Sequence, residues 1–376
     1  MSAFPLMSHV LPRGQVLQVP AVVEERFRQL RVSGGAAPDP EGVRRILVRS
    51  PNWVGDAVMS LPVLPGLAHL FPYAEITVLA VPRVAPLFLH HPLVARVIHY
   101  PAGRQKWRRL WALRKNYDLG LALPNSLESA LGLWLAGAPV RAGYTADARR
   151  PFLTRAVSGR NNLQGLHLVF YYLGTLKALG AIDAYSPPAL YLGHRELQEA
   201  EARLAATGGD SPGPWVGLAP GAAYGPAKRW PAESFAALAL ELDRQMGARL
   251  VLLGGPEDRA AAAAVKAQLP VPVLDLVGQT DLRQALAVLS CLRLLVTNDS
   301  GLMHAAAALG TPLVAIFGST DPRATGPFTD RATVLRHPLP CSPCFQRTCP
   351  EDYPCLTAIT VEEALAAARP WLEQSP

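Results

Sequence analysis

The feature that most constrains the fold is an alternation of short apolar runs with helix-like stretches, which occurs in two separate parts of the chain. The first series places elements at 45–49, 56–70, 76–81, 97–100, 105–115 and 118–123. The second places them at 215–219, 232–246, 249–253, 258–268, 273–276, 282–290, 292–297, 301–309 and 313–317. Strands that alternate with helices predict βαβ units and parallel sheets. We therefore expect two doubly wound α/β halves, with ligands at the carboxyl ends of strands and in the cleft between the halves.

Chain length and turn-rich stretches suggest the domain boundaries. A chain of 376 residues fits about two domains. Before the first series stand a helical piece at 22–32 and a loop at 33–40, and a Gly/Pro-rich stretch at 208–214 precedes the second series. We expect an N-terminal extension and two Rossmann-like domains, the second ending in a cysteine-rich segment, with the ranges 1–42, 43–190 and 191–376.

Composition excludes several classes of protein. Half of the residues are hydrophobic and 17% are charged, the opposite of the balance that keeps a chain disordered. We expect no transmembrane helix, because Glu128, Arg293 and Asp299 interrupt the best candidate stretches. The first residues lack the compact apolar region of a secretory signal. Five cysteines in 376 residues do not make a disulfide scaffold, so the expected compartment is the reducing cytoplasm.

The net charge of +7 is unevenly distributed. Residues 1–180 hold 21 Lys and Arg against 9 Asp and Glu, a net charge of +12, whereas residues 181–376 hold 15 against 20, a net charge of −5. The stretch 104–115 alone carries six cations, with Trp107 and Trp111 four residues apart on one helix. A basic half fits nucleic acid, acidic lipid or a phosphorylated glycan as partner. The alternative is a solvated basic surface whose two tryptophans belong to the core.

The first candidate site is the segment 50–56, between the first strand and its helix. Gly55 allows the backbone to approach a ligand closely. Asp56 lies at the expected start of the helix, where it either faces a ligand or stabilises the helix N-terminus. A complete Gly-x-Gly-x-x-Gly is missing from the sequence, which argues against dinucleotide binding in the ordinary mode.

Two further candidates follow strands of the second series. The segment 219–231 combines glycines with Lys228 and Arg229, which fits a phosphate cradle or a plain turn with solvated cations. In the segment 296–304, Ser300 and Gly301 would place free N–H groups at a helix N-terminus, which suits an anion. Asp299 fits a sugar hydroxyl or a loop support, and His304 taken alone fits a packing role as well. The hydroxyl-bearing loop 317–322 also follows a strand.

The fourth candidate is a set of cysteines in a Pro-rich stretch near the C-terminus. Four thiols within fifteen residues are enough for a tetrahedral zinc site, although the spacing departs from paired Cys-x-x-Cys knuckles. A reduced thiol cluster and a redox-labile staple are the alternatives. The four residues are Cys341, Cys344, Cys349 and Cys355.

Three of these segments together resemble glycosyltransferase family 9, the heptosyltransferases of lipopolysaccharide core synthesis, and in particular the heptosyltransferase II branch. The similar stretches are Asn52-Trp-Val-Gly-Asp56, the segment 220–231, and Asn298-Asp-Ser-Gly-Leu-Met-His304 together with Gly318-x-Thr-Asp-Pro322. The resemblance runs over about residues 43–370. The cysteine-rich stretch also resembles that branch, with Tyr353 where a histidine is expected.

The resemblance implies a GT-B fold and an inverting transfer of heptose. The donor would be ADP-L-glycero-β-D-manno-heptose and the acceptor the heptosyl-Kdo-lipid A inner core. By motif position Asp56 resembles the catalytic base. The implied donor-binding residues are Gly221, Lys228, Arg229, Glu257, Asp299, Ser300, Gly301, Leu302 and His304. We expect the acceptor to meet Asn52, Trp53, Gly55, Arg141 and Arg149.

The resemblance also bears on cofactors, partners and location. The sequence contains no Asp-x-Asp, so no metal cofactor is expected to be required, and Mg²⁺ stays open. The implied partners are the donor, the lipid-linked acceptor and an anionic membrane surface rather than nucleic acid, with the protein peripheral on the cytoplasmic face of the inner membrane. The alternatives are a related enzyme using another nucleotide sugar, such as an epimerase, and a non-catalytic sugar-binding relative.

Overall fold

The computed structural model describes residues 16–100, 103–207 and 213–373, and it divides the chain into two compact units. Unit 1 comprises Met1–Tyr191 and unit 2 comprises Leu192–Pro376, a division one residue from the expected boundary. Residues 208–212, most of the expected turn-rich stretch, lie outside the described residues. Each unit is a doubly wound α/β structure, as expected for the GT-B class.

Unit 1 is built on a sheet of seven strands within the described ranges, in the order β2-β8-β7-β6-β3-β4-β5. The strands are β2 (Arg31–Gly34), β3 (Arg45–Arg49), β4 (Glu75–Ala80), β5 (Val94–His99), β6 (Leu119–Ala122), β7 (Val140–Tyr144) and β8 (Arg155–Ser158). All pairs are parallel except β2–β8. The central strand β3 is a run of apolar residues because both of its faces are buried.

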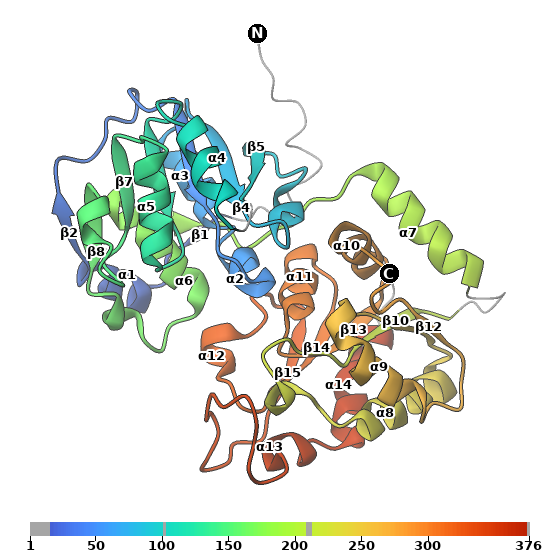
Figure 1. The fold of residues 1–376 in the computed structure, drawn as a ribbon. Helices are drawn as coiled ribbons and strands as arrows, with labels where there is room; N and C mark the ends of the chain where they lie inside the picture. The colour runs from blue at the N-terminus through green and yellow to red at the C-terminus, as the bar shows by residue number, and fades with distance from the viewer. Residues whose placement is uncertain (1–15, 101–102, 208–212, 374–376) are drawn as a thin grey trace. The chain divides into compact units, whose positions relative to one another are not determined.

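The helices of unit 1 cover both faces of this sheet. They are α1 (Ala21–Arg28), α2 (Val54–Met59), α3 (Val63–Leu70), α4 (Gln105–Ala112), α5 (Leu127–Leu135) and α6 (Leu168–Leu173). Helices α4 and α5 lie beside each other in Figure 1 and enclose a core that contains Leu47, Leu110 and Leu133. The single helix expected at 56–70 is two helices, because Pro62 cannot donate a backbone hydrogen bond and disfavours helical backbone before it.

The described part of the expected N-terminal extension belongs to unit 1. Strand β1 (Leu17–Gln18) pairs with β9 (Ala184–Tyr185), and β2 joins the edge of the main sheet beside β8. The sequence predicted a helix end and a loop where β2 lies. Its four residues are all exposed, so this edge strand has no apolar pattern by which it could be found.

Unit 2 contains a sheet of six parallel strands over its described residues, in the order β12-β11-β10-β13-β14-β15. The strands are β10 (Trp215–Ala219), β11 (Arg249–Leu252), β12 (Val273–Asp275), β13 (Leu294–Asn298), β14 (Leu313–Ile316) and β15 (Ala332–Leu335). The sheet grows in opposite directions from β10 and β13. The carboxyl ends of these two neighbours therefore form the switch point at which doubly wound sheets bind ligands.

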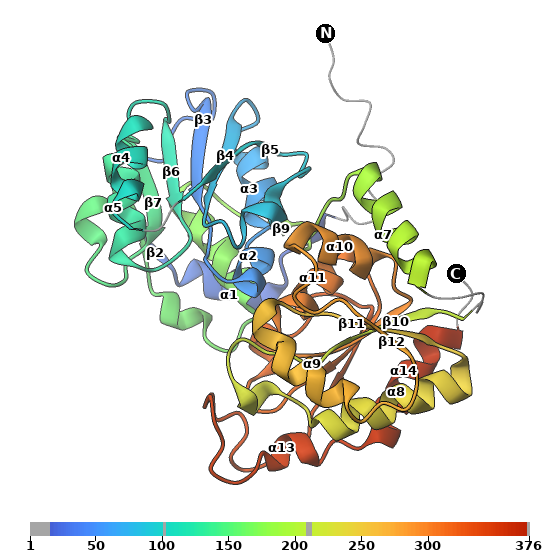
Figure 2. The same ribbon diagram turned by 45° about the vertical axis from the view of Figure 1, so that its right-hand side comes forward.

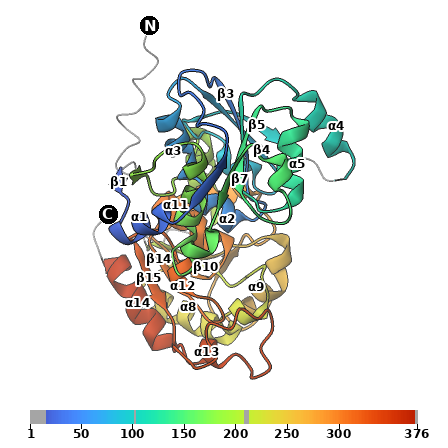
Figure 3. The ribbon, with the colours of Figure 1, turned by 90° about the vertical axis from the view of Figure 1, so that its left-hand side faces the viewer.

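Helices lie on both faces of this sheet as well (Figure 2). One face carries α8 (Ala232–Met246), α9 (Arg259–Lys266) and α14 (Val361–Glu373), which share one hydrophobic core. The other helices include α7 (His194–Thr207), α10 (Leu282–Ser290) and α11 (Gly301–Leu309), which pack against one another in that order along the chain. Short helices α12 (Pro322–Thr325) and α13 (Pro354–Thr357) follow later in the sequence, α13 just before α14 (Figure 3).

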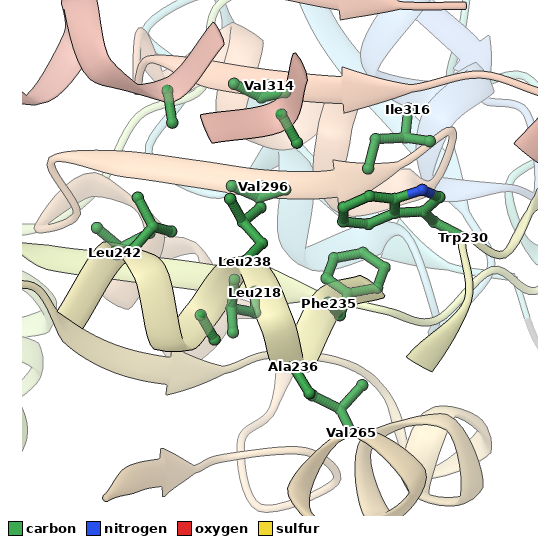
Figure 4. Packing of buried hydrophobic residues seen from close by; sticks show 14 of the residues in the cluster. Leu218, Trp230, Phe235, Ala236, Leu238, Leu242, Val265, Val296, Val314 and Ile316 are labelled. Carbon is green, nitrogen blue, oxygen red and sulfur yellow. The ribbon is translucent and has the colours of Figure 1, made fainter. Parts of the chain in front are cut away.

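The core of unit 2 anchors one of the candidate loops. Trp230 is almost fully buried and its ring meets Phe235 edge-on, with the ring centroids 5.2 Å apart (Figure 4). Its indole N–H also donates to the backbone oxygen of Ile359 at 3.0 Å. Because Trp230 directly follows Arg229 and lies two residues after Lys228, this packing anchors the backbone of the segment that carries both cations.

In the described ranges, no helix combines the length and the apolar character that crossing a bilayer would require.

Candidate active site

In unit 1, Asp56 lies in the first turn of α2, directly after the loop that follows β3. Its carboxylate is half-buried and accepts a hydrogen bond from the hydroxyl of Tyr172, in α6, at 2.8 Å. Burial, and then the charge of Asp56, raises the pKa of Tyr172 well above its usual range. The phenol therefore stays protonated near neutral pH and remains a donor. The arrangement holds a carboxylate in one orientation at the carboxyl end of a central strand.

Cationic side chains support the other residues of this loop. Arg49 is buried and donates to the side-chain oxygen of Asn52 at 2.7 Å, while its guanidinium lies 4.4 Å from the ring centroid of Tyr100. Trp53 is half exposed, with the guanidinium of Arg83 at 5.0 Å from its ring. Gly55 precedes Asp56 within α2. Asn52 and Trp53 thus lie exposed at the surface of unit 1, in the loop directly before α2.

Two of the expected acceptor residues have a different place. Arg149 has no exposed surface, and it donates to the backbone oxygen of Tyr144 at 2.7 Å and to the hydroxyl of Ser129 at 3.0 Å. Burial lowers its pKa to about 10. Arg141 donates to the backbone oxygens of Phe152 and Ala138. Both guanidinium groups support loops of unit 1 through backbone carbonyls, so the structure gives no support for a contact of either with an acceptor.

In unit 2, the candidate loops converge at one edge of the sheet. The segment 220–229 follows β10, Asp299 follows β13, and the loop 317–321 follows β14. These three strands are adjacent and parallel, so their carboxyl ends meet. Buried Asn298 ties two of the loops together, since its side-chain oxygen accepts from the N–H of Trp230 at 3.0 Å and its amide donates to the oxygen of Pro220 at 2.8 Å.

An ion pair lies at the centre of this edge. The ammonium of Lys228 is 2.5 Å from a carboxylate oxygen of Asp299, and the hydroxyl of Thr320 donates to the same oxygen at 2.6 Å. Asp299 is 5% exposed, so its charge is almost entirely withdrawn from water. Asp299 therefore fixes the position of the lysine at this edge of the sheet.

The glycine and arginine of the loop after β10 meet a second carboxylate. Asp258 lies against Gly221, at which a Cβ atom would come within 2.1 Å of the carboxylate, so a side chain there would displace the carboxylate. One oxygen of Asp258 accepts from the N–H of Gly255 at 3.0 Å. Burial raises the pKa of Asp258. Arg229 donates to the backbone oxygen of Ala222 at 3.2 Å, so it supports this loop from within.

The helix after β13 begins as the sequence predicts. The hydroxyl of Ser300 caps α11 by accepting from the N–H of Met303 at 3.4 Å, and Gly301 opens the helix. Leu302 is half-buried, whereas His304 is buried among the helix contacts. Glu257 is exposed in the loop after β11. The first turn of α11 thus presents backbone N–H groups at the same edge as Lys228.

The four clustered cysteines carry free thiols. Burial, followed by the nearby thiols of the other three, raises the pKa of Cys355. Within the ranges that the structure describes, no three His, Cys, Asp or Glu side chains are grouped so as to hold a metal ion.

The structure also brings in residues that sequence reasoning missed. Tyr172 lies 116 positions from Asp56, and nothing in its neighbourhood marks it. Thr320 stands within the motif Gly318-x-Thr-Asp-Pro322, which could have indicated it. Asp258 follows Glu257 directly in the chain, so the acidic pair itself was the available signal.

Comparison with known proteins places this arrangement in a family. Residues 107–353 match the model of glycosyltransferase family 9 (heptosyltransferase). The chain is 35% identical over 307 residues to lipopolysaccharide heptosyltransferase 2 of Salmonella typhimurium. The aligned region covers 78% of this chain and 88% of that protein.

Two solved structures are also similar. One is the ADP-heptose lipopolysaccharide heptosyltransferase II of E. coli, with a TM-score of 0.73, 31% identity, and coverage of 87% of this chain and 98% of that one. The other is the family 9 glycosyltransferase of Veillonella parvula, with a TM-score of 0.79, 26% identity, and coverage of 90% and 99%. The chain belongs to glycosyltransferase family 9, the heptosyltransferase family.

Proposed function

We propose that this protein transfers heptose from ADP-L-glycero-β-D-manno-heptose to the heptosyl-Kdo-lipid A inner core of lipopolysaccharide. The observation that carries the proposal is its similarity, over most of both chains, to proteins named lipopolysaccharide heptosyltransferase 2. The geometry of the two units agrees with the two tasks that such a transfer needs: removal of a proton from a hydroxyl and stabilisation of a departing diphosphate.

In unit 1, Asp56 takes the proton of the acceptor hydroxyl. The oxygen of that hydroxyl attacks the anomeric carbon of the heptose, and the bond from that carbon to the diphosphate oxygen breaks with inversion. An ordinary carboxylate is a weak base, and it suffices when the proton leaves late, after much of the leaving-group bond has broken. The hydrogen bond from Tyr172 keeps one carboxylate oxygen occupied and the group oriented.

In unit 2, Lys228 and the first turn of α11 bind the diphosphate of the donor. The lysine supplies a fixed positive charge, and Ser300 and Gly301 stand at a helix N-terminus, where anions are stabilised. Glu257 meets the adenosine ribose, and Asp299 and His304 support the loop that holds the donor. These groups stabilise the charge that collects on the diphosphate as the sugar leaves, and we propose that no metal ion is required, with Mg²⁺ at most an addition.

The release of ADP tests this function. We expect ADP to appear only when the ADP-heptose donor and the lipid-linked heptosyl acceptor are both supplied, and to appear equally in EDTA. ADP-glucose and UDP-sugars serve as control donors, and a Kdo-lipid A acceptor without heptose serves as control acceptor. Turnover of the donor alone would favour an epimerase or hydrolase, and the absence of turnover with every pair would favour a non-catalytic relative.

Replacing Tyr172 by Phe should change the pH dependence of the reaction. Phe keeps the buried ring and removes the hydrogen bond to Asp56. Because that bond favours the charged carboxylate, we expect the acidic limb of the kcat/KM profile to move to higher pH. The basic limb should stay in place, since Tyr172 is protonated in the parent at these pH values. An unmoved acidic limb would show that Tyr172 does not act on the base.

We further propose that the basic helix of unit 1 rests on the anionic cytoplasmic surface of the inner membrane. In α4 and the turn after it, Trp111 is 55% exposed with the guanidinium of Arg114 at 4.2 Å from its ring. Trp107 packs against the core instead, so the expected aromatic pair is reduced to one surface residue. Lys106 is paired with Glu128. The exposed cations that remain are Arg104, Arg108, Arg109, Arg114 and Lys115.

Removing four of these charges should weaken binding to anionic vesicles. Each cation near such a surface adds up to about 1 kcal/mol, so co-sedimentation should fall steeply and the KM for lipid-linked acceptor should rise, while ADP affinity stays unchanged. The variant replaces by Gln the residues Arg108, Arg109, Arg114 and Lys115. A matched control replaces four exposed arginines of unit 2, namely Arg195, Arg244, Arg331 and Arg369. Equal losses in both variants, or in neither, would mean that α4 has no special role.

A further inference from the structure

The cysteine segment, residues 341–355, packs against two of the loops that follow strands of unit 2, namely those after β10 and β14. On one side, the backbone oxygen of Arg347 accepts from the N–H of Ala227 at 3.1 Å, and that of Phe345 accepts from the hydroxyl of Tyr224 at 2.5 Å. On the other side, the N–H of Phe345 donates to the oxygen of Ser319 at 2.8 Å. The segment therefore connects the loop after β10 with the loop after β14.

This contact depends on a glycine. Gly225 has a φ of +152°, and a Cβ atom there would lie 2.5 Å from the backbone oxygen of Arg347. A side chain at this position would force the two backbones apart. The close approach of residue 347 to the loop that carries Lys228 is thus specified by the sequence and is not a chance meeting of two surface loops.

The ring of Tyr224 interacts with two cations. The ammonium of Lys228 lies 4.8 Å from its centroid, and the guanidinium of Arg347 lies 5.3 Å from the same centroid. Both distances are within the range of a cation–π interaction. Tyr224 is itself held at its hydroxyl by the cysteine segment. One half-buried ring therefore positions a cation from each of two distant parts of the chain.

The charges at this place are not balanced. Lys228 is paired with Asp299, but in the described part of unit 2 no carboxylate forms an ion pair with Arg347. Asp299 thus balances the charge of Lys228, whereas the exposed Arg347 adds a positive charge at the same ring. A guanidinium offers a planar set of donors that matches a phosphate group in a way that an ammonium cannot. A phosphate or diphosphate has the charge and the acceptor oxygens that such a guanidinium binds.

We propose that Arg347 is a second diphosphate-binding cation of the donor site and that Tyr224 positions it beside Lys228. This inference rests on the proposed use of a nucleoside-diphosphate donor and adds a residue from the cysteine segment to that site. Lys228 forms an ion pair with buried Asp299. Arg347 has no such carboxylate partner among the described residues, so its full positive charge can act on the phosphate that becomes the leaving group. The cysteine segment then serves to carry this arginine.

Calorimetric titration with three probes tests the proposal: ADP, adenosine and inorganic pyrophosphate. Arg347→Gln should weaken ADP and pyrophosphate by about tenfold and leave adenosine unchanged, because only a charge-assisted bond to phosphate is lost. Arg347→Lys should restore part of the affinity. Arg331→Gln, which removes an exposed arginine elsewhere in unit 2, is the matched control and should bind all three probes like the parent.

Variants of Tyr224 separate positioning from direct contact. Tyr224→Phe keeps the ring and should stay within about threefold of the parent, whereas Tyr224→Leu should lose about as much pyrophosphate affinity as Arg347→Gln. The double variant Tyr224→Leu with Arg347→Gln should lose little more than either single variant, since both remove the same interaction. Thermal unfolding of each variant shows whether the fold is retained. If Arg347→Gln or Tyr224→Leu unfolds unit 2, the milder variants Arg347→Lys and Tyr224→Phe still test the proposal.

The outcomes distinguish this proposal from the function on which it rests. Unchanged pyrophosphate affinity in Arg347→Gln would overturn it, and so would an equal loss of adenosine, which would show a structural role. The parent could bind pyrophosphate through Arg347 and yet prefer another nucleotide to ADP. That result would support the role of Arg347 and contradict ADP-heptose as the donor. A parent that binds neither ADP nor pyrophosphate would overturn both.

Discussion

Asp56→Asn is expected to bind ADP like the parent and to transfer heptose about 10²–10⁴-fold more slowly, the usual contribution of a general base. Asparagine has the same shape, and its side-chain oxygen can still accept from the hydroxyl of Tyr172, so the packing around α2 should be unchanged. What is lost is the ability to take a proton from the acceptor hydroxyl. Single-turnover transfer and ADP calorimetry on the same preparation measure the two effects.

Asn52→Ala provides a matched control, since it alters the same loop and removes the partner of Arg49 without touching the carboxylate. It should change the KM for acceptor more than the single-turnover rate. Near-parental turnover in Asp56→Asn would mean that another group accepts the proton, and the assignment of the base would have to be abandoned.

Lys228→Ala should have the second large effect, and on two properties at once. Loss of a charge-assisted bond to phosphate should weaken ADP by roughly 10–150-fold. The change also leaves buried Asp299 with Thr320 as its remaining hydrogen-bond partner among those described for that carboxylate oxygen. Breaking a buried pair by removing one partner costs up to about 3–5 kcal/mol, so the unfolding free energy of unit 2 should fall as well.

A double variant separates the two effects. Adding Asp299→Asn to Lys228→Ala removes the buried charge and should restore much of the stability, while ADP affinity stays low. Arg229 is the competing candidate, because it follows Lys228 directly, yet its guanidinium is engaged with the backbone oxygen of Ala222. Unchanged ADP affinity in Lys228→Ala with a loss in Arg229→Ala would require the two roles to be exchanged.

The sequence predicted most of the sheet because each central strand is a short apolar run buried on both faces. Strands β3 and β10 and helices α8, α10 and α11 have the predicted bounds. Where burial is one-sided or lacking, the pattern disappears, and β2 with its four exposed residues was predicted as helix end and loop. The break between α2 and α3 could have been predicted, because Pro62 marks it in the sequence.

For the candidate site, strand ends were informative and long-range partners were not. Asp56, Lys228 and Asp299 each follow a strand directly or within a loop, and that position together with the family motifs suggested them. Arg149 shows the opposite case, because a basic residue in a polar-looking loop proved to be fully buried with its donors on oxygen atoms of unit 1. The contacts of Tyr172 with Asp56 and of Arg347 with Tyr224 arise only from the fold, so no local pattern could indicate either residue.

The most direct test of the account is mass spectrometry of the lipid-linked acceptor after incubation with ADP-heptose, with ADP measured in the same sample. The account predicts an acceptor heavier by one heptosyl residue, ADP released in equal amount, and neither change with Asp56→Asn within the same time. ADP released without any gain of mass on the acceptor, or an acceptor elongated equally by parent and Asp56→Asn, would contradict it.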